Sequence, residues 1–412
     1  MKKDDPRREY DSVEKYLPKN GWLGKYLNYT QGLEFCPRFR FFSSASVLGA
    51  AINNKAWIQR GDEDLLPKLF PNVWVLLLAP PGRGHKTSAI NMPTNCLMEA
   101  CPDVRILADK LTPEYLVKGL SAPVTKGERI RIGPRDATGL IKAPEVSVFF
   151  GRQQYNVGLV SLITDLYDYR EEWRGGTIGR GGETLKNVCI SILGGSTPDW
   201  LQCMLPQDAF TGGFMSRFVI VELPTAYFKR ITEPKRPKDI SWAEIVSGLS
   251  EISRQKGVIT WGKGSKEAYD KYYQASAPTG NTQRDAYRER ETEQILKISM
   301  LLAISVKRME LSGNDIDQAA NIIYALREEV DSRIDRLTSH PRMHVTQEIK
   351  DLLRMHGELG EDILLSKVYK NLEGGERQYY EALNILRKTN QIEILGKSPN
   401  YSYKLKEEKK DD

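Results

Sequence analysis

A short apolar run that opens into a glycine-rich loop constrains the fold of this 412-residue chain more than any other feature. The segment Val73-Trp-Val-Leu-Leu-Leu-Ala-Pro-Pro-Gly-Arg-Gly-His-Lys-Thr87 predicts a buried strand and a tight loop, and a helix-like stretch follows. Glycines let backbone N–H groups curl around an anion, and a helix N-terminus adds N–H donors of its own. The segment therefore predicts a phosphate-binding loop at the edge of a parallel α/β sheet.

The loop is one residue longer than the standard phosphate-binding spacing, G-x-x-x-x-G-K-S/T. Counting forward from Gly84 places His85 where the lysine belongs, whereas counting back from Lys86 and Thr87 makes His85 an insertion. The second register keeps the lysine for the phosphates and the hydroxyl for Mg²⁺, so we prefer it; a tight turn with an incidental Lys-Thr pair is the alternative. The residues expected to hold ATP are Pro81, Gly82, Arg83, Gly84, His85, Lys86 and Thr87.

Composition narrows the class of protein. No run of about 18 apolar residues is present and the first residues lack a signal-peptide pattern, so a cytoplasmic protein without a membrane partner is expected. The five cysteines form no C-x-x-C pair, which favours buried reduced thiols over a zinc site. The net charge of +6 is mild, so it permits a nucleic-acid partner without requiring one.

Four regions are expected along the chain. Residues 1–70 form an N-terminal helical region, and residues 71–224 alternate strands and helices, as in a P-loop α/β core. Residues 225–338 begin with a basic, proline-punctuated linker and continue as helices that would form a lid. Residues 341–412 combine three helices with two strands about a turn, which predicts a winged helix that ends in a charged tail.

The same patterns predict individual elements. In the core, strands are expected from Val73, over 104–108, ending at 139–145, and over 188–193 and 217–222, with helices from 112 and over 156–169. In the later regions, helices are expected over 294–304, 315–337, 344–356, 364–372 and 376–390, and two strands within 392–405.

A phosphate loop that hydrolyses ATP needs a carboxylate at the end of a neighbouring strand, to support Mg²⁺ or to polarise the attacking water. Glu145, Asp109 and Asp165 each follow an apolar segment, and Glu145 is preferred. Asp165 is expected on a helix, where it could be only a surface acid.

Other polar residues could act at the same site. Ser196 or Thr197, after the strand over 188–193, could lie beside the γ-phosphate as a polar sensor of hydrolysis; simple turn chemistry is the alternative. Arg217 follows two glycines and could neutralise transition-state charge in the next subunit of a ring; a structural salt bridge is its alternative. Three basic residues of the lid offer a weaker candidate for a second phosphate sensor: Arg288, Arg290 and Lys297.

The C-terminal region carries basic and aromatic residues suited to contact with the DNA backbone. The basic residues are Lys367, Lys370, Arg377, Arg387, Lys388 and Lys397, and the aromatic ones are Tyr379, Tyr380, Tyr401 and Tyr403. Winged helices also bind proteins, so protein contact is the alternative for this region.

Over about residues 20–335 the chain resembles a family of primase- or helicase-like P-loop proteins of phages, prophages and plasmids. The segments that carry the resemblance are Pro71–Gly82, Lys110–Glu114, Ala143–Gly151, Leu162–Asp168, Leu193–Trp200 and Gly213–Arg217. Each segment is weak alone, and together they are fairly specific.

The core of that family is similar to AAA+ helicases of the superfamily 3 and minichromosome-maintenance kind. The resemblance implies that Lys86 and Thr87 are the phosphate-loop pair and that Glu145 is the Walker B acid. It also implies Ser196 or Thr197 as the sensor and Arg217 as the arginine finger, and His85 departs from the family pattern. No zinc ribbon or recognisable primase domain is present in the sequence, so primase activity would need another chain.

The expected protein is therefore an ATP- and Mg²⁺-dependent DNA helicase of a phage or mobile element. It would form a homohexamer, act on single-stranded or forked DNA, and work with a primase or another replication partner. Two other functions remain open: a non-hydrolysing nucleotide-binding adaptor or helicase loader, and a defence or regulatory ATPase whose winged helix contacts protein.

Overall fold

The computed structural model of the chain divides into two compact units, Met1–Ile334 and Asp335–Asp412. The three regions expected before residue 338 lie in the first unit, except for residues 335–338, which belong to the second. The structure describes residues 12–62, 65–108, 111–121, 136–147, 158–177, 181–204, 213–225, 227–235, 237–276, 278–338, 341–369, 375–397 and 400–406.

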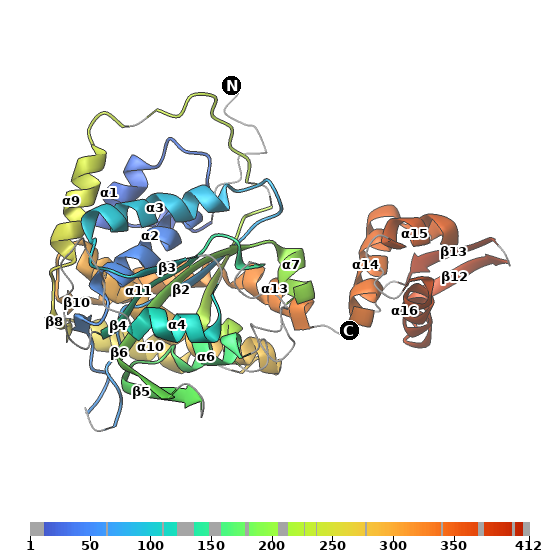
Figure 1. Ribbon diagram of the computed structural model, residues 1–412. Helices are drawn as coiled ribbons and strands as arrows, with labels where there is room; N and C mark the ends of the chain where they lie inside the picture. Colours follow the sequence, from blue (N-terminus) through green and yellow to red (C-terminus); the bar gives the residue numbers. More distant parts are fainter. Residues whose placement is uncertain are drawn as a thin grey trace. The chain divides into compact units, whose positions relative to one another are not determined.

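A mixed sheet forms the centre of the first unit (Figure 1). Its order is β3-β4-β6-β2-β7, and these five strands are parallel. Their bounds are Trp74–Leu78 for β2, Ile106–Ala108 for β3, Asp136–Ala143 for β4, Gly181–Ser196 for β6 and Phe218–Glu222 for β7. Strand β2 is buried along its whole length between β6 and β7, as its continuous apolar run predicts for a strand covered on both faces.

Helices cover both faces of the sheet (Figure 1). Helices α2 (Pro37–Ile52) and α3 (Lys86–Ala100) pack on one face, whereas α4 (Pro113–Ser121), α6 (Leu159–Asp165) and α7 (Pro198–Met204) lie on the other. The connection after β2 and the connection after β6 therefore pass over opposite faces. In parallel α/β sheets, ligands bind outside the carboxyl ends of the strands at such a reversal, which here lies between β2 and β6.

The N-terminal helices belong to the core of the first unit. Every residue of α2 is buried, and α1 (Gly21–Tyr29) packs against α2. Helix α2 begins at Pro37, because proline suits the first turn of a helix. A short 3₁₀ helix, η1, spans Glu14–Tyr16.

The helices after the sheet differ from the prediction in length. The expected helix over 315–337 is two helices, α12 (Gly313–Tyr324) and α13 (Arg327–Thr338), and the turn between them lets Arg327 bond to Glu291 of α11. Helix α11 starts well before the predicted 294, because Asn281 caps its first turn. The remaining bounds are α9 Trp242–Ile252, α10 Ser265–Gln274 and α11 Thr282–Ser305, with short strands β1 Ala56–Trp57, β8 Gly257–Val258, β9 Thr260–Trp261 and β10 Glu310–Leu311.

A hairpin that the sequence pattern does not predict projects from the sheet (Figure 1). Strand β5 (Arg170–Thr177) pairs antiparallel with the first half of β6, so β6 starts earlier than the predicted 188. The expected helix over 156–169 is shorter within the described residues, because α6 ends at Asp165 and the chain turns into β5.

The second unit has its own core of apolar side chains. The three predicted helices and the two-stranded hairpin are present, and an additional short strand joins the hairpin in the order β11-β13-β12. Their bounds are α14 Pro341–His356, β11 Glu358–Gly360, α15 Glu361–Val368, α16 Glu376–Lys388, β12 Ile392–Lys397 and β13 Asn400–Leu405.

Two expectations from composition concern the described part of the chain. Cys36, Cys96, Cys101 and Cys189 are buried free thiols, and the side chain of Cys203 lies outside the described residues. Burial raises the pKa of the Cys96 and Cys189 thiols to about 12, so neither is a thiolate near neutral pH. Among the described helices, none is long and apolar enough to cross a lipid bilayer.

Candidate functional site

The loop after β2 has the backbone geometry of an anion cradle. Gly82, Gly84 and His85 all have positive φ angles, of 68°, 74° and 49°. A Cβ on Gly84 would lie 3.1 Å from the Cβ of Ala79 and 3.2 Å from Phe39, so a glycine fits this turn best. The helix that follows leaves its first N–H groups without intrahelical partners, and these groups open toward the loop.

Lys86 and Thr87 are the first two residues of α3. The Nζ of Lys86 donates to the carbonyl oxygen of Ala79 at 2.8 Å, so the half-buried ammonium lies over the start of the loop. Burial lowers the pKa of Lys86, and the Glu145 carboxylate opposes that shift. The Thr87 hydroxyl is exposed at the mouth of the loop.

His85 points elsewhere, because its Nε2 lies 2.7 Å from a carboxylate oxygen of Glu34. The loop thus separates its two basic residues, with Lys86 toward the loop's own backbone and His85 toward the N-terminal segment. This arrangement supports the register in which His85 is the inserted residue.

The carboxyl ends of β4 and β6 bring polar groups beside the loop. Leu78 pairs with Ser196, and Ala143 pairs with Gly194, so Glu145 reaches the level of Ser196. A Cβ on Gly195 would lie 2.7 Å from the carbonyl oxygen of Pro144 and 3.6 Å from the Cβ of Lys86. The glycine therefore permits the close approach of these segments. Glu145 is exposed and accepts a hydrogen bond from Ser147 at 3.1 Å.

Ser196 and Thr197 have different surroundings. Ser196 is fully buried at the end of β6, and its carbonyl oxygen accepts a hydrogen bond of 3.3 Å from the N–H of Ala79, the first residue of the loop. The Thr197 hydroxyl instead accepts a hydrogen bond from the N–H of Trp200. Thr197 therefore caps α7, which begins at Pro198. For Thr197 the structure favours the alternative of turn chemistry.

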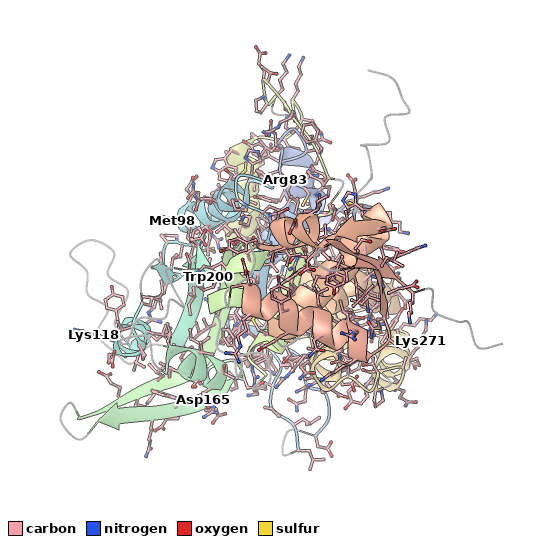
Figure 2. All side chains as sticks on the ribbon, turned by 90° about the vertical axis from the view of Figure 1, so that its right-hand side faces the viewer. Arg83, Met98, Lys118, Asp165, Trp200 and Lys271 are labelled. Carbon is pink, nitrogen blue, oxygen red and sulfur yellow. The ribbon has the colours of Figure 1, made fainter. Side chains whose placement is uncertain are left out.

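The two other candidate acids do not join Glu145. Asp165 is the last residue of α6, as expected, and it bonds to Arg170 and to the indole N–H of Trp173 at the base of the β5–β6 hairpin. Figure 2 shows Asp165 and the loop residue Arg83 at opposite ends of the first unit. Asp109 lies outside the described residues.

Arg217 lies at the other edge of the sheet. It ends the short helix η3 (Met215–Arg217), directly before β7, and Phe218 pairs with Trp74 at the start of β2. Its Nη1 donates to the carbonyl oxygen of Gly213 at 2.8 Å, and its Nη2 lies 3.9 Å from Asp168. The ion pair predicted as the alternative is thus longer than a hydrogen bond.

Arg217 belongs to a group of charges around the buried ring of Tyr167. The guanidinium groups of Arg217 and Arg290 lie 5.3 and 5.5 Å from the ring centroid, and the Nζ of Lys297 lies 4.3 Å from it. The Tyr167 hydroxyl donates to Glu293 at 2.9 Å, and Lys297 lies 3.2 Å from the same carboxylate oxygen. Because burial and the like charge of Arg290 disfavour its charged form, the pKa of Arg217 is lowered.

The sequence predicts only part of this group. Arg217, Arg290 and Lys297 are candidates from the sequence, whereas Tyr167 and Glu293, which hold them, are not. The spacing of Arg290, Glu293 and Lys297 at i, i+3 and i+7 on one helix was the available signal. Arg288, the remaining lid candidate, bonds to Asp331 of α13 at 2.6 Å and does not join the group.

The basic residues of the C-terminal unit are spread over its surface. Lys367, Arg377, Arg387 and Lys388 are exposed, and Arg377 also bonds to Glu381. Lys370 and the side chain of Lys397 lie outside the described residues. Residues 341–412 contain thirteen Lys or Arg and thirteen Asp or Glu, so this region has no net charge.

Two of the four tyrosines predicted to contact DNA are in the core instead. Tyr379 is 0% and Tyr403 5% exposed, because Tyr379 shares the apolar face of α16 with Ala382, Leu383 and Leu386. Tyr380 is exposed and Tyr401 is partly buried. The aromatic part of that prediction is therefore wrong for Tyr379 and Tyr403.

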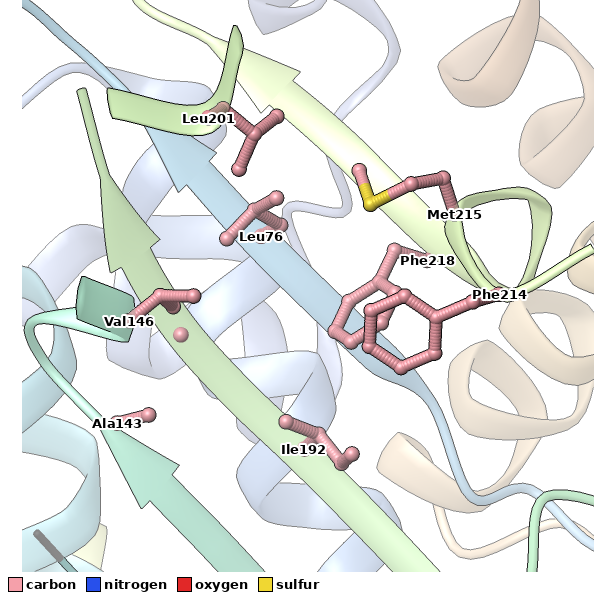
Figure 3. A pocket seen from close by; sticks show the side chains of 9 residues that line it. Leu76, Ala143, Val146, Ile192, Leu201, Phe214, Met215 and Phe218 are labelled. Atoms are coloured by element: carbon pink, nitrogen blue, oxygen red, sulfur yellow. The ribbon is translucent and has the colours of Figure 1, made fainter. Parts of the chain in front are cut away.

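A small apolar cavity lies on the sheet face that α7 covers (Figure 3). Leu76 of β2, Ile192 of β6 and Phe218 of β7 point into it, together with Leu201 of α7. No polar side chain lines it, so it lacks the groups that would orient a nucleotide.

Comparisons with known proteins give structural similarities but no match in sequence. No protein-family model matches the sequence, and no curated protein matches it. The chain is structurally similar to a full-length MCM homologue from Methanopyrus kandleri, with a TM-score of 0.43 and 14% sequence identity. The similarity covers 80% of this chain and 63% of the homologue, so the chain spans less than two thirds of that protein's length.

Proposed function

We propose that the protein is an ATPase whose nucleotide binds at the carboxyl edge of the sheet, between β2 and β6. One observation carries this proposal: Lys86, Glu145 and Ser196 lie close together around the loop. Three residues of that loop, Gly82, Gly84 and His85, have positive φ angles. The position coincides with the reversal of the connections in the sheet, where α/β proteins bind ligands. The glycine cradle and the adjacent ammonium suit the phosphates of ATP.

Each residue at this edge has a role that its chemistry allows. Lys86 would hold the β- and γ-phosphates, and the backbone N–H groups of Gly82 and of residues 84–87 would surround them. Thr87 and Glu145 supply the hydroxyl and carboxylate oxygens that Mg²⁺ prefers, and the metal would neutralise phosphate charge. Glu145 is also free of a competing ion pair within 4 Å among the described residues, so it could orient the attacking water. Ser196 is the candidate polar sensor.

Arg217 would act on the nucleotide of a neighbouring copy. It precedes β7 at the amino edge, and the five residues of β2 separate that edge from the loop by about 16 Å at roughly 3.3 Å per residue. An arginine side chain cannot span this distance within one chain. A head-to-tail ring would bring Arg217 and Arg290 of one copy to the phosphate loop of the next. We therefore propose a ring, with six copies as the expected number.

Two surfaces of the chain could contact DNA. The α16 helix presents Arg377, Tyr380 and Lys388 on its exposed side, which suits phosphate and groove contacts. The β5–β6 hairpin carries Arg170 and Arg174, both exposed, at the opposite edge of the sheet from the phosphate loop. These features support a DNA helicase-like motor that acts in the replication of a phage or mobile element. A primase or another replication protein would be its partner.

One observation favours a second function. The C-terminal unit has no net charge, whereas a DNA-binding unit is usually basic. A nucleotide-binding adaptor or loader, or a defence or regulatory ATPase whose C-terminal unit binds protein, would need no basic surface there.

Steady-state ATP hydrolysis, measured with and without single-stranded DNA, separates these functions. A helicase-like motor should hydrolyse ATP and turn over several-fold faster with DNA. Binding of ATP without turnover would identify the adaptor, and turnover that DNA does not change would identify the regulatory ATPase.

A further inference from the structure

The inserted residue of the phosphate loop connects it to a distant part of the chain. The His85 Nε2 lies 2.7 Å from one carboxylate oxygen of Glu34, and the other oxygen of Glu34 accepts a hydrogen bond of 2.8 Å from the N–H of Ile231. Arg230 lies 3.7 Å from Glu34. One carboxylate therefore joins the loop, the N-terminal segment and the segment that follows β7.

Further contacts hold the same three segments together. The guanidinium of Arg83, also in the loop, donates to the carbonyl oxygen of Tyr227 at 3.1 Å. Lys229 donates to the carbonyl oxygen of Gln31 at 2.6 Å. We call residues 227–231 the strap; Figure 1 shows the segment that contains it passing from the end of β7 across the unit to α9. The strap thus holds the loop through Arg83 directly and through His85 by way of Glu34.

We propose that Glu34 is a positioning residue for the phosphate loop, which it holds in its binding shape through His85 and the strap. This inference rests on the proposed nucleotide site. Its physical basis is the backbone of His85, which has a φ of 49°, in the left-handed region that residues other than glycine adopt uncommonly. The bond to Glu34 compensates for that strain and places the following N–H groups of α3.

The charges around Glu34 agree with this role. The hydrogen bond from the N–H of Ile231, together with the imidazole of His85, holds the pKa of Glu34 below its usual value against the opposing effect of burial. The carboxylate is therefore ionised at neutral pH, where it can accept both bonds. If the inserted His85 had no role, its bond to Glu34 and the bond of Glu34 to the strap would serve no purpose at this site.

The test is a binding measurement on the full chain. Calorimetric titration with ATP and Mg²⁺ would compare Glu34→Gln, His85→Ala, the double variant and the control Glu233→Gln, an exposed carboxylate beyond the strap. Each single substitution should raise Kd about five- to tenfold, as for the loss of one ordinary hydrogen bond. The double variant should be no weaker than the worse single variant, because both changes break the same bond. The control should match the unmodified protein.

Two results would overturn the inference. One is a Kd for Glu34→Gln equal to that of the control, and the other is an effect of the double variant equal to the sum of the single ones. Thermal unfolding of each variant, together with His85→Asn, whose side chain suits a positive φ, identifies any loss that comes from misfolding. Failure of the proposed function is distinguishable, because Lys86→Ala would then leave ATP binding unchanged.

Discussion

The carboxyl and amino edges of one parallel sheet carry the two halves of the candidate site, and they are built in opposite ways. At the carboxyl edge, Lys86 bonds to a backbone carbonyl, and Glu145 is exposed and accepts a hydrogen bond from Ser147. At the amino edge, Arg217 lies in a group of charges held by the buried Tyr167 and Glu293.

The difference follows from what each edge would have to do. When an anion binds, the phosphate loop gives up its own contacts, such as the bond of Lys86 to a backbone carbonyl. Weak internal bonds at the carboxyl edge therefore lower the cost of binding. An arginine that acts on another copy has to be in place before that copy arrives, and preorganised packing achieves this. The contrast predicts that substitutions at the amino edge lower both catalysis and the stability of the fold, whereas those at the carboxyl edge change ATP binding or turnover and leave the stability unchanged.

The largest expected effect concerns catalysis across the two edges. Arg217→Ala should lower ATP turnover by about 10³-fold or more, the range measured for arginines that act in trans, while ATP still binds. Glu145→Gln should likewise bind ATP and lose turnover. Mixing the two variants should restore part of the activity, because some interfaces of a mixed ring then combine an intact Glu145 with an intact Arg217.

Steady-state turnover of the mixture at several ratios measures this complementation. Arg217→Lys is the matched control, since it keeps the charge but loses the planar fork, and it should recover little activity. A mixture that stays inactive, or an Arg217→Ala variant that unfolds, would contradict action in trans and support a structural role for Arg217.

The second effect tests the folding part of the contrast. Glu293→Ala would leave Lys297, 3% exposed, as a buried charge without its partner, and this should cost about 3–5 kcal/mol of unfolding free energy. Glu145→Ala, which removes an exposed carboxylate, should change it by less than about 0.5 kcal/mol. Urea unfolding of both variants measures the difference, and equal losses would remove the proposed distinction between the edges.

The stabilisation by Glu293 should also depend on pH. Burial favours the neutral form of Glu293, but Lys297 and Arg290 together hold its pKa below the ordinary 4.5. A carboxyl group whose folded pKa is depressed stabilises the fold fully above its unfolded pKa, and this stabilisation is lost as the pH falls through the folded value. The gap in stability between Glu293→Ala and the unmodified protein should therefore be constant from pH 6 to 8 and should shrink below pH 4.5.

The third effect concerns ligand binding at the carboxyl edge. Lys86→Ala should weaken ATP binding by about 100-fold, because the lysine would make charge-assisted hydrogen bonds to two phosphates. His85→Ala should weaken it less than about tenfold, since His85 faces Glu34. Calorimetric titration of both variants decides the register. If His85→Ala abolished binding while Lys86→Ala did not, His85 would occupy the position of the lysine.

The sequence predicted the carboxyl edge better than the amino edge, and the reason is physical. A phosphate loop is local: the strand, the glycines and Lys86 are adjacent in the sequence, so their spacing alone predicts the geometry. The group around Tyr167 combines residues from α11, from η3 and from the turn before β5. No spacing in the sequence links Asp168 to Arg217 and Arg290, and only the folded sheet brings them together.

Two further misses have local causes. The β5–β6 hairpin contains Gly175, Gly176, Gly181 and Gly182 and alternates charges of both signs, so it lacks the apolar alternation by which strands are recognised. The tyrosines of α16 were assigned by residue type alone. The period of the helix places Tyr379 with Ala382, Leu383 and Leu386 and could have predicted its burial.

The smallest expected effect on either edge comes from the C-terminal unit. Residues 335–412 form a separate compact unit, so deleting residues 341–412 should leave the Kd for ATP within about twofold of its value in the full chain. The same deletion should weaken DNA binding about tenfold at low salt. It should also make binding less dependent on salt, because the phosphates that are no longer contacted keep their counterions. Fluorescence anisotropy with a labelled single strand, over a series of salt concentrations, measures both quantities.

Charge reversal separates a specific DNA surface from a general effect of charge. Changing Arg377, Arg387 and Lys388 to Glu should reproduce the deletion without unfolding the unit, because all three are exposed. The matched control changes three exposed lysines of the first unit to Glu: Lys256, Lys263 and Lys266. It alters the net charge by the same amount, so a similar loss of affinity there would show that overall charge dominates. If neither the deletion nor the α16 variant weakened DNA binding, the C-terminal unit would bind protein, and the β5–β6 hairpin would be the surface to test next for DNA.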